Sequence, residues 1–191
     1  MKKKKGLIIT AVVVVIIIAI VGAFAGSYNG LVSKREAVTT AQANIQTQLQ
    51  RRADLIPNLV NTVKGYAEHE EDVYTAIADA RSALAGATTV DEMNTANGAL
   101  DSALSRLLVV VENYPDLKAN ENFINLQDEL AGTENRINKA RQEYNELAQE
   151  YNTKIQKFPT NIIAGMFNFD SADYFKATDS ATTVPTVDFG K

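Results

Sequence analysis

The stretch from Phe123 to Phe158 constrains the fold most, because its apolar residues recur at intervals that alternate between three and four. The series comprises Phe123, Leu126, Leu130, Ile137, Ala140, Tyr144, Leu147, Tyr151 and Phe158, with Thr133 and Lys154 at two of the intervening positions. Such spacing is typical of a helix with one buried stripe. We therefore predict one helix of about 38 residues, roughly 57 Å long, which needs a partner of similar length.

The amino-terminal segment predicts a membrane anchor. Residues 7–25 contain no charge and have about the length that a helix needs to cross a bilayer. The lysines at residues 2–5 favour a cytoplasmic amino terminus, which places the rest of the chain outside the cytoplasm. A cleaved signal peptide is the competing interpretation, because Ala23-Phe24-Ala25 matches the small–x–small cleavage pattern. The length and the Val and Ile content of the segment favour a retained anchor.

The remaining periodicities predict an all-α fold, an up-and-down four-helix bundle of long helices that follows one transmembrane helix. The first bundle helix continues to about residue 67, with a kink near Ala53 because Pro57 lies inside it. The other three are expected over residues 68–84, 91–114 and 120–158. Gly86 terminates the helix expected over residues 68–84. If the chain stays helical through residues 65–71, three helices result instead.

These boundaries predict five regions. They are a basic cytoplasmic tip (residues 1–6), a transmembrane helix (7–25), a polar hinge (26–32), the helical bundle (33–169) and a flexible carboxy-terminal tail (170–191).

Composition limits the chemistry that the chain can perform. It has no Cys and a single His, His69, which excludes disulfides, thiolate catalysis and Cys-containing zinc sites. The whole chain carries a net charge of −4 although it begins with four lysines, so the body is acidic and does not favour nucleic acid. No Ser/His/Asp, His-Glu-x-x-His, Walker or Rossmann pattern is present. We expect no catalytic residue, cofactor or metal ligand.

Arg52 is the first candidate site residue, because it lies on the apolar stripe seven residues after Ile45 and seven before Leu59. A guanidinium at a buried position needs a carboxylate. Antiparallel pairing of the two long helices places Arg52 near Ile137, and Glu134 lies one turn from Ile137. We predict an Arg52–Glu134 ion pair that fixes helix register; a ligand-binding arginine is the alternative.

Two further candidates are aromatic or apolar. Tyr144 and Tyr151 each precede an asparagine and lie seven residues apart on one helix face, which predicts core packing, with a ligand-binding strip as the alternative. A cluster that includes Ile162, Ile163 and Phe167 follows the last long helix, and it either meets the membrane or a partner or caps the bundle.

Four sequence blocks together resemble the LemA family of bacterial membrane proteins. They are Tyr28-Asn29-x-Leu31, QLQRRADLIPNLV (residues 48–60), ENYPDLKANENFINLQDELAGTENRINKARQEYNELAQEYN (112–152) and FPTNIIAGMFNF (158–169). The resemblance implies four long helices behind an amino-terminal anchor and no enzymatic activity or cofactor. Proteins similar to it are often encoded near membrane metalloproteases, which is compatible with an adaptor role.

We therefore expect a non-enzymatic, single-pass protein of the bacterial cell envelope whose partner is another envelope protein or a second copy of itself. A binding module that holds a small or lipid-like ligand between its helices is the alternative.

Overall fold

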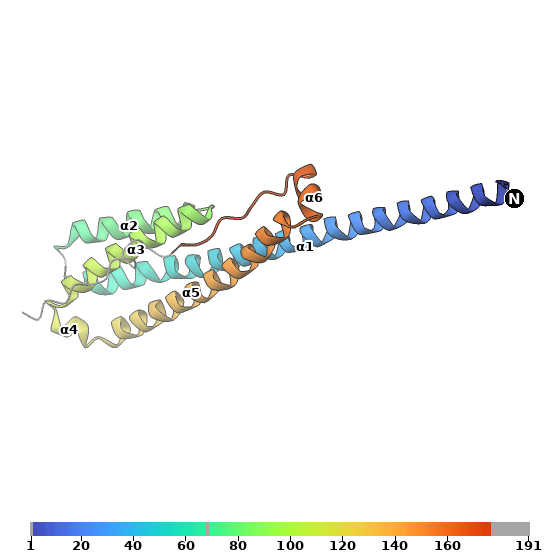
Figure 1. Cartoon of the computed structure of the whole chain (residues 1–191). Coiled ribbons are helices and arrows are strands. Elements are labelled where there is room, and N and C mark those ends of the chain that lie inside the picture. The colour runs from blue at the N-terminus through green and yellow to red at the C-terminus, as the bar shows by residue number, and fades with distance from the viewer. Residues whose placement is uncertain (1, 68, 177–191) are drawn as a thin grey trace, which may run out of the picture. The chain divides into compact units, whose positions relative to one another are not determined.

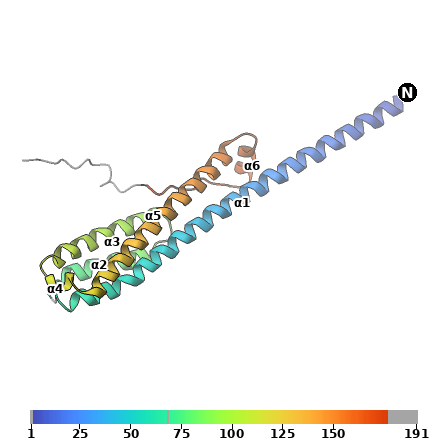
Figure 2. The same cartoon turned by 90° about the horizontal axis from the view of Figure 1, so that it is seen from below.

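The computed structural model describes residues 2–67 and 69–176, with side chains from Thr10 onward. Within these ranges the chain forms helices and no strand (Figures 1 and 2). The helices are α1 (Lys2–Lys64), α2 (Glu71–Gly86), α3 (Val90–Val111), α4 (Pro115–Lys118), α5 (Glu121–Gln156) and α6 (Thr160–Met166). The predicted all-α class is therefore confirmed.

Contacts divide the chain into two compact units. The first unit joins Met1–Thr40 to Glu146–Ala172, and the second joins Ala41–Asn145 to the chain from Asp173. Both long helices, α1 and α5, contribute residues to each unit.

The core of the second unit is built by the carboxy-terminal half of α1 together with α2, α3 and α5. Each contributes fully buried apolar side chains, among them Ile45, Ile56 and Leu59 of α1, Ile77 of α2, Met93, Leu100 and Leu107 of α3, and Phe123, Ile137 and Tyr144 of α5. Burying each such side chain is worth about 1.5–3 kcal/mol. Burial of these apolar stripes, more than local helix propensity, stabilises the long helices.

The helices α1 and α2 are separate. α1 ends at Lys64, and the amides of Tyr66 and Ala67 both donate to the carbonyl of Val63, at 2.9 and 3.0 Å. This closes α1 and removes the three-helix alternative. The third predicted helix ends at Val111, and the turn around Pro115 forms the short helix α4.

Pro57 lies inside α1 and leaves one carbonyl without its helical donor. Proline has no N–H, so the carbonyl four residues earlier, that of Ala53, loses its partner. In the structure Arg81 of α2 replaces it, because its Nε donates to the Ala53 oxygen at 2.8 Å. The helix thus tolerates proline through a bond from its neighbour; the kink near Ala53 stays a prediction.

The first unit corrects the predicted hinge, because residues 26–32 are helical. Tyr28 packs against Phe167 and Phe169, with ring centroids 4.9 and 5.7 Å apart, and Leu31 is fully buried. A Cβ on Gly30 would lie 3.3 Å from Nζ of Lys154, so this glycine gives room to a side chain of α5. These contacts are long-range in the sequence, and they outweigh the breaker tendency of the polar and glycine residues.

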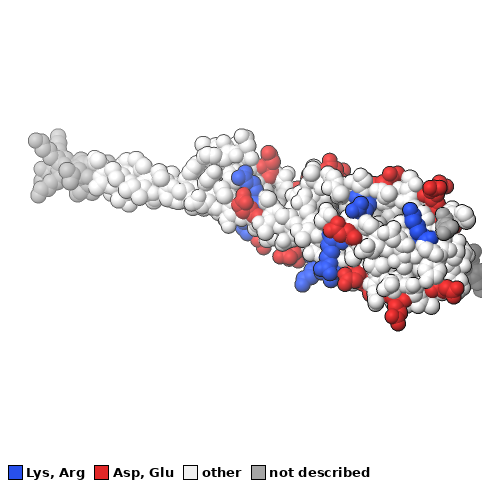
Figure 3. All heavy atoms as spheres, turned by 180° about the vertical axis from the view of Figure 1, so that it is seen from behind, with Lys and Arg blue, Asp and Glu red and all other residues white. Residues whose placement is uncertain are grey.

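One helix within the described part of the chain is long and apolar enough to cross a membrane, the part of α1 from Thr10 onward. Its side chains up to Gly26 are exposed, and none of them is charged. Figure 3 shows this slender stretch as an uncharged surface.

Candidate functional site: an apolar groove beside a buried charge cluster

A charge cluster lies inside the second unit around Arg52 of α1, which is 5% exposed. Its Nη1 donates to Glu134 Oε2 of α5 at 2.7 Å and to Asn97 Oδ1 of α3 at 2.6 Å. Its Nη2 donates to the carboxylate of Asp101 on α3. The structure therefore brings together the two residues of the predicted pair and adds two from α3 that the sequence analysis missed.

In this cluster the guanidinium is shielded from solvent, whereas both carboxylates are partly exposed. The side chains of Glu134 and Asp101 retain 30% and 43% exposure, whereas Arg52 retains 6%. Asn97 bonds to the cation and to one anion of the cluster, because its Oδ1 accepts from Arg52 and its Nδ2 donates to Asp101 Oδ2 at 3.2 Å. Arg141 of α5 lies near the cluster: burial lowers the pKa of its guanidinium, while the negative charges of Glu134 and Asp101 oppose that shift. Arg52 is thus paired with both carboxylates, whereas Nε and Nη2 of Arg141 are buried without a hydrogen-bond partner among the described residues.

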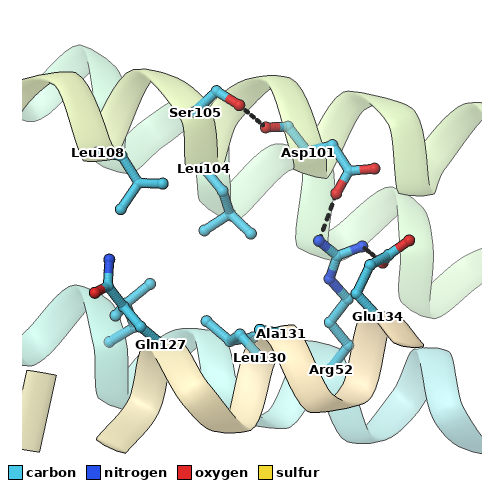
Figure 4. Close-up of a pocket in the computed structure, with 10 residues that line it drawn as sticks. Arg52, Asp101, Leu104, Ser105, Leu108, Gln127, Leu130, Ala131 and Glu134 are labelled. Atoms are coloured by element: carbon cyan, nitrogen blue, oxygen red, sulfur yellow. Dashed lines mark hydrogen bonds and ion pairs between the residues drawn. The ribbon is translucent and has the colours of Figure 1, made fainter. Parts of the chain in front are cut away.

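An apolar groove begins beside this cluster, between α3 and α5 (Figure 4). It has a volume of about 590 Å³ and is lined by Leu59, Leu104, Leu108, Leu130, Ala131, Gln127 and Ser105, with Arg52, Asp101 and Glu134 at one end. Its size lies in the range of ligand sites, about 300–1,000 Å³. Because the charges at its end already bind one another, the groove is suited to an apolar group rather than to an ion.

The sequence analysis did not find this groove. Leu108 is 44% exposed at its edge, and it adjoins the buried Leu107 in the sequence. Consecutive residues of a helix point about 100° apart, so Leu108 is turned toward the edge of the core that Leu107 faces, and this pair was the available signal.

Tyr144 and Tyr151, the predicted aromatic face, are each 2% exposed. The hydroxyl of Tyr144 donates to the carbonyl of Asp173 at 2.9 Å, and its ring meets Phe175 edge to face at 5.2 Å. Burial raises the pKa of the Tyr144 phenol, and the charge of Asp173 adds to the shift. The chain's own carboxy-terminal segment therefore covers Tyr144 where a ligand was considered.

The asparagine that follows each tyrosine holds this segment by its main chain. In the second unit, Asn145 accepts from the Phe175 amide and donates to the Phe175 carbonyl, both at 2.9 Å. In the first unit, Asn152 makes the same two bonds with Ala172, both at 2.8 Å. The flexible tail predicted from residue 170 is thus wrong for residues 170–176; residues 177–191 lie outside the described part of the chain.

These two asparagine clamps are seven residues apart on α5, and the residues that they hold are three apart in the carboxy-terminal segment.

The predicted apolar cluster divides between two faces. Ile163 is 4% exposed and packs inward, whereas Ile162 and Phe167 are 54% and 45% exposed. Among the residues that the structure describes, no group of three or more His, Cys, Asp and Glu side chains is placed to hold a metal ion.

Comparison with known proteins places these features in a family. Residues 41–189 match the family model described as the LemA family. Magnetosome protein MamQ 2 of Paramagnetospirillum magneticum is 25% identical, over 82% of this chain and 67% of the relative. Magnetosome protein MamQ of Magnetospirillum gryphiswaldense has the same identity and shares. Protein LemA of Metamycoplasma hominis is 26% identical, over 82% of this chain and 72% of the relative.

The family model covers Arg52, Glu134 and both asparagine clamps. The chain therefore belongs to the LemA family.

Proposed function

We propose that this protein is a non-enzymatic, single-pass protein of the bacterial cell envelope that binds a partner protein through the groove between α3 and α5. Family membership and the apolar part of α1 support a membrane-associated helical protein. The lysines at residues 2–5 support a cytoplasmic amino terminus and an extracytoplasmic domain.

The proposal treats α1, α2, α3 and α5 as an up-and-down four-helix bundle. Bonds between side chains and neighbouring helices support it: Arg52 bonds from α1 to α3 and α5, and Arg81 from α2 to α1. Gln42 of α1 also donates to the carbonyl of Thr88, in the connection between α2 and α3, at 3.0 Å. Such bonds make a rigid surface for recognition, which lowers the entropic cost of binding.

The groove is the single observation that carries the binding proposal. Its walls are apolar and Leu108 is exposed at its edge, so an apolar side chain of a partner has somewhere to be buried. Interface energy is concentrated in such pockets. At the end of the groove the carboxylates of Asp101 and Glu134 are both paired with Arg52, which favours an apolar group there over an ion.

The groove also supports a second function, retention of a small lipid-like ligand, because a volume of about 590 Å³ accommodates an acyl chain. The tyrosine strip gives no support to that alternative, since Tyr144 is covered by residues 173–175.

Site-specific photo-crosslinking in cells tests the proposal. A photoreactive residue at Leu108 is compared with the same residue at Val109, which is 69% exposed but does not line the groove. We expect a distinct crosslinked envelope protein from position 108 alone, and loss of that product when Leu104→Glu introduces a charge into the groove. Circular dichroism checks that this variant stays helical.

Equal crosslinking from both positions would refute the groove as the binding surface. Crosslinks to the same chain alone would favour self-association, and a lipid recovered with the purified protein and lost in Leu104→Glu would favour the ligand alternative. Protease treatment of intact cells tests the orientation, because an extracytoplasmic domain should be accessible there.

A further inference from the structure

Residues 158–169, FPTNIIAGMFNF, contain no charged side chain, although Lys157 and Asp170 flank them directly. Helix α6 forms the centre of this stretch. A helix at the surface of a water-soluble domain normally presents a polar face to solvent. This stretch differs, because large apolar side chains are exposed on its outer side as well.

The exposed apolar side chains of the stretch come from α6 and from the turn before it. Ile163 and Ala164 of α6 face inward and are 4% and 5% exposed. Ile162 and Met166, four residues apart on α6, are 54% and 63% exposed, and Phe158, in the turn that precedes α6, is 81% exposed. These three large apolar side chains, here called the outer cluster, mark a surface that contacts something other than water.

The position of α6 within the first unit indicates what this surface contacts. Phe167, at the end of α6, lies with its ring centroid 6.1 Å from that of Phe24 and 4.9 Å from that of Tyr28 on α1. Phe24 belongs to the apolar run proposed to span the membrane, and Tyr28 follows it by one helical turn. α6 therefore lies beside the end of that run, as Figures 1 and 2 both show. Aromatic side chains are enriched at this level of membrane proteins.

Charge in the same unit is complementary to a lipid surface. A cavity of about 320 Å³ is lined by Lys34, Lys154 and Lys157 together with Glu150. Lys34 is paired with Glu150 at 2.6 Å, so the other two lysines give this region a positive balance. Anionic lipid headgroups are attracted to such clusters near a membrane.

We propose that the outer cluster, Phe158, Ile162 and Met166, inserts into the interfacial layer of the same bilayer that α1 crosses. The inference rests on the proposed membrane span. The protein is then held to the bilayer at two points, one that spans it and one that lies in its surface, about 5–10 Å into the headgroup and acyl boundary. Rotation of the first unit about the axis of α1 is restricted as a result.

Depth-dependent fluorescence quenching tests this inference on the full chain. The protein has no Cys, so Ile162→Cys and Met166→Cys each provide a single site for an environment-sensitive dye. The labelled protein is reconstituted into vesicles of phosphatidylethanolamine and phosphatidylglycerol that carry a nitroxide either near the top or near the end of the acyl chain. Ile17→Cys reports the span, and Thr40→Cys, at an exposed position of α1 in the same unit and outside the lysine-lined cavity, reports water.

We expect the shallow nitroxide to quench the dyes at 162 and 166 about twofold more than the deep one does, as an interfacial depth requires. The dye at 17 should respond to the deep nitroxide and the dye at 40 to neither. If position 17 is quenched while 162 and 166 behave like 40, the inference is wrong and the span stands. Blue-shifted emission at 162 and 166 without quenching would also overturn it, because a protein surface then covers the outer cluster. If position 17 is not quenched, the proposed span fails and the inference fails with it.

Discussion

Replacing Arg52 with methionine tests whether the charge cluster contributes to the stability of the second unit. The substitution keeps an apolar stem of similar length and removes the guanidinium that bonds to Glu134, Asn97 and Asp101. We expect the variant to fold with the same helix content, because the apolar stripes of α1, α3 and α5 are unchanged.

The magnitude follows from what each partner loses. Asn97 is 2% exposed, and its Oδ1 loses a donor, which costs about 1–3 kcal/mol. Glu134 and Asp101 are partly exposed, so water replaces much of the lost interaction and they contribute little. Removing a buried guanidinium also relieves its own desolvation cost. We therefore predict a net loss of about 1–2 kcal/mol in the free energy of unfolding.

Urea-induced unfolding of the detergent-solubilised full chain, followed by circular dichroism, measures this loss. Arg51→Met is the matched control, because Arg51 is 56% exposed and lies 3.3 Å from the exposed Glu129. Its loss should stay under about 0.5 kcal/mol. Equal losses in the two variants would refute the reasoning. A double-mutant cycle with Glu134→Gln isolates the pair, and a coupling energy near zero would show that Glu134 does not contribute.

Three further predictions concern other bonds of the structure. Asn145→Ala should speed hydrogen exchange of the Phe175 amide by about thirtyfold, since two hydrogen bonds of about 1 kcal/mol each are lost; an unchanged rate would contradict the clamp. Arg81→Met should lower the free energy of unfolding by about 1 kcal/mol, but less in a Pro57→Ala background, where residue 57 regains the N–H that bonds the freed carbonyl; equal losses in both backgrounds would contradict this. Bonds from neighbouring backbone amides lower the pKa of Glu92 from 4.5 to about 2, so the stability that this carboxylate adds is complete above pH 4.5 and is lost as the pH falls toward 2. Glu92→Gln should therefore remove the pH dependence of the unfolding midpoint between pH 4.5 and 2. An unaltered pH profile would count against this role of Glu92.

The Arg52–Glu134 pair was predictable because a charged residue on an apolar stripe needs a partner of opposite charge. Arg52 at a buried position required a carboxylate, and antiparallel pairing of two long helices indicated Glu134. The partners on α3 were harder to find, because nothing in the sequence fixes how α3 is rotated against α1. Asn97 did offer a signal, since it lies between Met93 and Leu100 at helical spacing and is therefore a polar residue at a core position.

The errors share a physical cause. Residues 26–32 and 170–176 were judged by local composition, which is polar or rich in small residues. Their conformation is decided by contacts with residues far away in the sequence: Tyr28 with Phe167, and Phe175 with Asn145. Local propensity has no information about such contacts. The same limitation concealed the groove, which lies between α3 and α5 around Leu104 and Leu130.

The asparagine clamps have a consequence for how the segment tolerates substitution. Each amide reads only the N–H and C=O of the residue that it holds, so the bonds are indifferent to the side chain at Ala172. Side-chain recognition in the segment rests on Phe175, which meets the ring of Tyr144 and lies under the guanidinium of Arg141 at 5.3 Å. The segment is thus held by main-chain bonds that do not depend on its sequence and by one aromatic side chain, so its other positions can be substituted without loss of these bonds.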